Sequence, residues 1–147
     1  MAETLNNKPS TAYWIIAGIL LAWNLVGLMF YYQQSTLTID IMMDAGLTDQ
    51  QIAHITNTPA WAHAGYAFAV NAGVLGALLL LLRKAWAIPL FYISLAGALV
   101  QDIDAFVMRD ALEAWGTTAV ALPLIVILIC AFEIWYARRA KAKGWAS

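Results

Sequence analysis

Four long apolar runs, separated by short polar segments, constrain what this 147-residue chain can fold into more than any other feature. They cover about residues 13–32, 59–82, 86–108 and 117–136. Each run is at least about 20 residues long, which is the length that a helix needs to cross a bilayer. The sequence therefore predicts an all-α polytopic membrane protein, a bundle of four transmembrane helices forming a single domain over residues 1–147.

Composition agrees with this fold class. The chain is 63% hydrophobic and only 12% charged, whereas soluble domains are about 45–50% apolar and about 25% charged. The first run is too long for a signal-peptide core, and no small-residue cleavage site follows it, so we expect an uncleaved first span. The first dozen residues are polar and are predicted to be a loose tail.

Residues 33–58 form the only long polar segment, and the pattern predicts two short amphipathic helices within it. Apolar residues recur at helical spacing from Ile39 to Met43. Thr48, with Gln51 three residues later, makes a capping box that begins the second helix. We expect both helices to lie on the membrane surface or to cap the bundle.

The basic residues predict the topology. Four spans place both termini on one side, and that side carries seven of the eight Lys and Arg residues, with only Arg109 opposite. The 33–58 loop has none. The excess of Lys and Arg on cytoplasmic segments predicts a bacterial inner-membrane protein with cytoplasmic termini and a periplasmic 33–58 loop. The basic tail from Arg138 to Lys143 is expected to touch anionic lipid.

Small residues recur along one face of the second span at spacings of three and four. They are Ala62, Gly65, Ala69, Ala72, Gly73 and Gly76. Small side chains let helix backbones approach closely in lipid. This stripe either packs the chain against itself or offers a face to a partner helix, in a homo-oligomer or in a larger membrane complex.

Two amides, Asn24 and Asn71, lie near the middles of the first and second spans at similar depth. An amide in lipid favours an interhelical hydrogen bond worth on the order of 1 kcal/mol. We therefore expect these two side chains to bond each other. The alternative is that they contact a substrate at the midplane.

The third span carries acids that need partners or water. At 100° per residue, one face of the helix carries Ser94, Gly97, Gln101 and Asp104. This polar stripe is predicted to face the bundle interior. Asp102 lies about 160° around the helix from Asp104. The spacing therefore predicts that Asp102 faces elsewhere, with the Arg109 side chain curling back toward it.

Two interpretations of these acids follow. Both acids lie near the outer end of the span. In the first interpretation they reach outer water or bond the 33–58 loop; in the second they form a proton or cation site with His63 and His54. Asp and His are ligands for divalent metals, which makes His54, His63 and Asp104 candidate ligands. Their spacing is unspecific, and no resident metal or cofactor is predicted.

Near the other end of the bundle, Glu133 is predicted to lie about one turn from the cytoplasmic end of the fourth span. There it is expected to snorkel to the interface, or to form a salt bridge with Arg83, Lys84 or Arg138. Cys130, the single cysteine, excludes an internal disulfide and is interpreted as a small buried apolar residue.

Some segments resemble known families. Met43-Asp44-Ala45-Gly46-Leu47 and the stretch from Ala69 to Trp86 give a layout loosely similar to DoxX-like membrane proteins. Those proteins often carry an acid in span two, where this chain has Asn71. The segments 13–18, 81–87 and 137–140 more closely resemble small four-span proteobacterial inner-membrane proteins, some of which are labelled sugar transporters. That resemblance covers most of the chain. No sugar-binding pattern is recognisable in this sequence, so the label implies little about function.

The chain has no glycine-rich phosphate loop, CxxC pair or HExxH pattern, and no basic patch typical of nucleic-acid binding. The leading prediction is a non-catalytic accessory or structural subunit, embedded in the lipid bilayer and packed through the small-residue stripe. The second is a small-solute or ion transporter that works as an oligomer, with Asp104 and Gln101 in its polar stripe. The third is a metal-binding or enzymatic site at the outer face, built from His63, Asp102 and Asp104.

Overall fold

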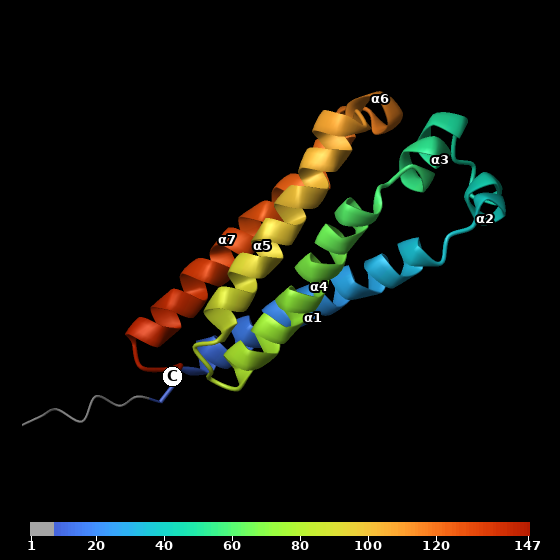
Figure 1. The fold of residues 1–147 in the computed structure, drawn as a ribbon. Helices are drawn as coiled ribbons and strands as arrows, with labels where there is room; N and C mark the ends of the chain where they lie inside the picture. The colour runs from blue at the N-terminus through green and yellow to red at the C-terminus, as the bar shows by residue number, and fades with distance from the viewer. Residues whose placement is uncertain (1–7) are drawn as a thin grey trace, which may run out of the picture.

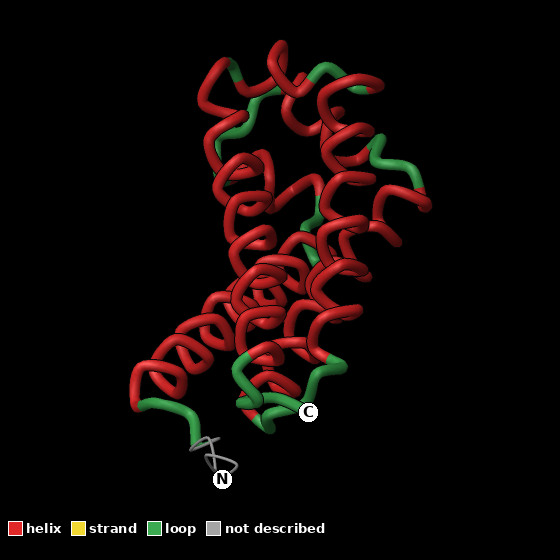
Figure 2. The backbone as a smooth tube through the Cα atoms, turned by 90° about the vertical axis from the view of Figure 1, so that its left-hand side faces the viewer, coloured by secondary structure: helices red, strands yellow, loops and turns green. Residues whose placement is uncertain are grey.

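The computed structural model describes residues 8–147, and this part of the chain contains helices and turns but no strand. Figure 2 shows that most of this part of the chain is helical, with short loops between the helices. The predicted all-α fold class is therefore confirmed. The predicted loose tail lies mainly in residues 1–7, outside the described residues. Ser10 already caps the first helix by accepting a hydrogen bond from the backbone of Tyr13.

Within residues 8–147, four helical spans are long and apolar enough to cross a membrane, which indicates an integral membrane protein. These spans contain α1 (Thr11–Ser35), α4 (Ala60–Leu81), α5 (Ala87–Ile103) with the turn that follows it, and α7 (Ala121–Ala142) with the turn that precedes it. A π-helical turn, η1 (Asp104–Met108), extends α5, and a 3-10 turn, η2 (Thr117–Val120), precedes α7.

Three short helices lie between the spanning ones. The segment after α1 forms α2 (Ile39–Asp44) and α3 (Asp49–Thr56), as predicted. Both bonds of the capping box between Thr48 and Gln51 are present. The third short helix, α6 (Ala111–Trp115), follows η1 and packs against α3.

The spanning helices pack in the order α1, α4, α5, α7, so α4 and α5 are central. The chain ends at one end of the bundle, which we call the terminal end. The opposite end, which we call the loop end, carries α2, α3 and α6 (Figure 1). In that view α1 and α4 lean away from α5 and α7 toward the loop end.

The terminal end holds the main apolar core. Tyr13 and Phe91 are fully buried there, and the Tyr13 hydroxyl donates to the Leu80 carbonyl. The Tyr13 ring stacks on Tyr136 with centroids 6.1 Å apart. The backbone N–H of Ser147 donates to the Arg83 carbonyl at 2.9 Å, closing this end. Helices α1 and α7 are therefore joined at the terminal end.

The small-residue stripe of α4 is buried inside the chain itself. A Cβ on Gly97 of α5 would lie 2.4 Å from the Gly65 carbonyl oxygen and 2.8 Å from the Ala69 nitrogen. The two backbones therefore touch where α4 and α5 cross. This supports the packing interpretation of the stripe. The alternative, a free face for a partner helix, is wrong because α5 and α1 cover these residues.

Candidate intramembrane binding site

A buried polar contact joins α1 and α7, the two outer helices in the packing order. Asn24, near the middle of α1, donates from Nδ2 to Oε1 of Glu133 on α7 at 2.5 Å and to the Leu20 carbonyl at 2.8 Å. Glu133 is 1% exposed and Asn24 is 8% exposed. Gly73 makes room for the amide, since a Cβ there would lie 2.0 Å from the Asn24 Oδ1.

The expectation that Glu133 snorkels or forms a salt bridge with a basic residue is wrong, because its side chain is buried and accepts from Asn24. Helix α7 continues to Ala142, because the residues after Tyr136 are mostly alanine, arginine and lysine, which favour helix. Glu133 therefore lies about 13 Å from the helix end at 1.5 Å per residue. It shares its buried face with Cys130 and Ala137, and its hydrogen-bond partner among the described residues is Asn24 rather than a basic side chain.

The predicted bond between Asn24 and Asn71 is also wrong. Asn71 is exposed and donates to the Ala67 carbonyl of its own helix at 2.8 Å. Similar depth alone does not bring these two amides into contact. The rotation of α4 about its own axis turns Asn71 to the outside, while Gly73 faces Asn24.

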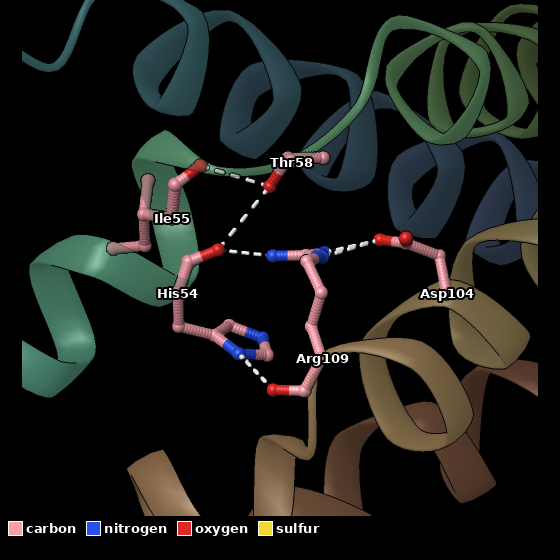
Figure 3. A network of polar contacts seen from close by, with 5 residues as sticks. All are labelled: His54, Ile55, Thr58, Asp104 and Arg109. Atoms are coloured by element: carbon pink, nitrogen blue, oxygen red, sulfur yellow. Dashed lines mark hydrogen bonds and ion pairs between the residues drawn. The ribbon is translucent and has the colours of Figure 1, made fainter.

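At the loop end, Arg109 joins η1 to α3. Its Nε donates to Oδ2 of Asp104 at 2.6 Å, and its Nη2 forms an ion pair with the same oxygen. Its Nη1 donates to the His54 carbonyl of α3. Figure 3 shows the guanidinium held between Asp104 and the end of α3. Asp104 is thus linked to the 33–58 loop through Arg109, which fits the first of the two interpretations for this acid but not for Asp102.

The expected pairing of Arg109 with Asp102 is wrong because of the π-helical turn. The Arg109 N–H donates to the Asp104 carbonyl, five residues back, at 3.0 Å. A π turn brings residues i and i+5 onto one side, whereas the α-helical phase separates them.

His54 completes this junction. Its Nδ1 lies 3.2 Å from the Arg109 carbonyl oxygen, so Nδ1 carries the proton and donates. Burial lowers the pKa of His54 from its ordinary value, and the nearby positive charge of Arg109 lowers this pKa further. The neutral imidazole is therefore favoured beside the guanidinium.

A cavity of about 290 Å³ lies between the spanning helices, and all four contribute to its wall. This volume is at the small end of the range of about 300–1,000 Å³ found for ligand pockets. Its lining is mainly apolar with a few polar side chains. These residues are Trp23, Asn24, Val26, Gly27, Phe30, Tyr66, Ala69, Val70, Ser94, Ala98, Gln101, Asp102, Leu122, Pro123, Val126 and Cys130.

Asp102 lines this cavity, although the helical phase predicted that it faces elsewhere. The reason is that α5 is a central helix with α4 on one side and α7 on the other, so two of its faces point into the bundle. Gln101 also lines the cavity, whereas Asp104 does not. Among residues 8–147, neither Asp102 nor Gln101 has a side-chain hydrogen bond or ion pair.

The proposed metal ligands do not come together. Asp104 is bonded to Arg109, and His54 bonds the Arg109 carbonyl. His63 has no hydrogen-bond partner in the part of the chain that the structure describes. That part contains no group of three or more His, Cys, Asp or Glu side chains placed to hold a metal ion.

The fold and the site of residues 8–147 define a class: a four-helix integral membrane protein with a small cavity among its spans, in whose wall Asp102 and Gln101 have no partner among the described residues. Comparisons with protein-family models, with curated proteins and with solved structures found no match for this chain. A function can therefore be proposed only from the chemistry of the residues themselves.

Proposed function

We propose that the protein is a small-solute transporter, and that its solute binds in the cavity between the four spanning helices. One observation carries this proposal. The cavity is bounded by Asn24 near the middle of α1, and its wall presents Asp102 and Gln101 without partners among the described residues. Polar groups inside a membrane are expensive unless they are paired or serve a function.

The site differs from the one expected for a transporter in one respect. The acid in the cavity is Asp102, whereas Asp104 is held by Arg109. The accessory-subunit alternative has weaker support, because its docking face is already buried between α4 and α5.

The proposal includes a topology and an assembly. The distribution of basic residues favours a bacterial inner membrane, with cytoplasmic termini and the 33–58 loop in the periplasm. The small volume enclosed by one copy favours an oligomer as the working form.

Two isosteric probes test the proposal: neutral tert-butylbenzene and cationic phenyltrimethylammonium. At least one should bind saturably to the protein in lipid nanodiscs, measured by equilibrium dialysis against empty nanodiscs. Gly27→Leu should weaken that binding by about tenfold or more, equivalent to about 1.4 kcal/mol. Gly27 lines the cavity, and an added Cβ there meets Cγ1 of Val70 at 3.8 Å, an ordinary contact distance, so a leucine at this position is expected to occupy ligand space.

Gly18→Leu is the matched control. Gly18 lies on the same helix, outside the cavity, and an added Cβ there meets nothing within 4 Å. This variant should bind like the wild type. Absence of saturable binding for both probes, or equal losses in the two variants, would contradict a cavity-bound solute.

A further inference from the structure

We infer that the solute carries a positively charged nitrogen, and that Asp102 binds this nitrogen inside the cavity. This inference rests on the proposed function, because it names the chemical class of the molecule that the cavity takes. The charge of the cavity wall, its aromatic rings and the position of its rim support it.

The charge of the cavity wall favours a cation. Asp102 is the one carboxylate among the lining residues, and no Lys, Arg or His lines the cavity. The nearest basic residue along the chain, Arg109, is engaged by Asp104 and by the His54 carbonyl. A cationic ligand would supply the missing partner, whereas an anionic ligand would meet an acid with no compensating base.

The wall of the cavity also contains aromatic rings. Trp23 and Phe30 from α1 and Tyr66 from α4 line the same cavity as Asp102. The faces of aromatic rings attract organic cations, most strongly where water is excluded. The side-chain oxygens of Gln101 and Ser94 add hydrogen-bond acceptors. Carboxylate, rings and acceptors all favour a cation.

The rim of the cavity offers a route by which a solute can enter. Three lining residues remain largely exposed on the outside of the bundle: Val26 at 44%, Phe30 at 53% and Leu122 at 62%. They belong to α1 and to the start of α7, the outer helices that diverge toward the loop end (Figure 1). The rim of the cavity therefore reaches the lipid-facing side. An amphipathic cation that partitions into the bilayer could enter there with its apolar part in lipid.

The test compares three probes in nanodiscs: phenyltrimethylammonium, its neutral isostere tert-butylbenzene, and anionic benzenesulfonate. The cation should bind more tightly than the neutral probe, and the anion least tightly. Asp102→Asn should weaken cation binding by about tenfold or more, because it removes the charge in a low-dielectric site. It should change neutral-probe binding by less than about threefold, as expected for an uncharged ligand.

Asp110→Asn is the matched control, since it makes the same change of charge at an exposed helix cap where asparagine serves equally well. It should leave the affinity for all three probes unchanged. Equal affinities for cation and neutral probe, unchanged by Asp102→Asn, would overturn the cation inference and leave the proposed function standing. Saturable binding of none of the probes would overturn both.

Discussion

Replacing Gly97 with alanine is expected to lower the free energy of unfolding by about 3 kcal/mol, at the upper end of the range for overpacking a buried site. An added Cβ would lie 2.4 Å from the Gly65 carbonyl oxygen and 2.8 Å from the Ala69 nitrogen. Both are backbone atoms, so no rotamer change can relieve the contact. The central pair, α4 and α5, would have to separate along its length.

The measurement is equilibrium unfolding in mixed micelles with increasing SDS, followed by helicity and tryptophan fluorescence. Gly18→Ala is the control, because it makes the same chemical change on a spanning helix with open space around the new methyl group. It should leave stability unchanged or slightly raised, since alanine favours helix over glycine. Equal stabilities of the two variants would contradict the close crossing of α4 and α5.

Replacing Asn24 with leucine is expected to lower the free energy of unfolding by about 2 kcal/mol. Interhelical hydrogen bonds in membranes contribute about 0.6 kcal/mol on average and at most about 1.7 kcal/mol. The bond to Glu133 should be near that maximum, because a carboxylate is a strong acceptor and because its loss leaves a 1%-exposed carboxyl group unpartnered.

The chain supplies a matched control for this variant. Asn71→Leu changes the same residue type at similar depth, but Asn71 is exposed and bonded only within its own helix, so the expected loss is below about 0.5 kcal/mol, as for surface substitutions. A double-mutant cycle of Asn24→Leu with Glu133→Leu should show coupling, and Glu133→Gln should retain most of the stability by keeping an acceptor. Additive losses in the cycle would show that the two residues act independently.

The elements of this fold could be predicted because they follow from local properties of the sequence. The length of each apolar run gave the four spans, and the Thr48–Gln51 spacing gave the start of α3. Small residues at spacings of three and four predicted the face on which α4 packs. None of these inferences needs the position of a distant residue.

The partners of the buried polar groups could not be predicted in the same way. Asn24 and Glu133 meet across 109 residues of chain, and their meeting depends on the order in which the helices pack. The Asp104–Arg109 pair depends on one π turn, for which a single sequence gives no distinct signal. Asp102 faces the cavity because α5 is central, and that position is set by the tertiary arrangement.

The two acids of the third span have different surroundings. Asp104 has a structural role, because it positions Arg109, and Arg109 fastens α3 to the end of α5. Asp102 is the acid that lines the cavity, and the proposed function assigns ligand binding to it. The two carboxylates are two residues apart in sequence, yet one is paired and the other is exposed to a cavity.

The reactivity of Cys130 tests the central claim most directly, because this single thiol lines the cavity and is only 5% exposed. In the folded protein it should react slowly with methyl methanethiosulfonate, a small reagent that can enter the cavity. A bound probe, phenyltrimethylammonium or tert-butylbenzene, should protect it. At about ten times the dissociation constant, mass action leaves about a tenth of the sites free, so the rate should fall about tenfold. A thiol that reacts equally fast with and without saturating probe would contradict a ligand site between these helices.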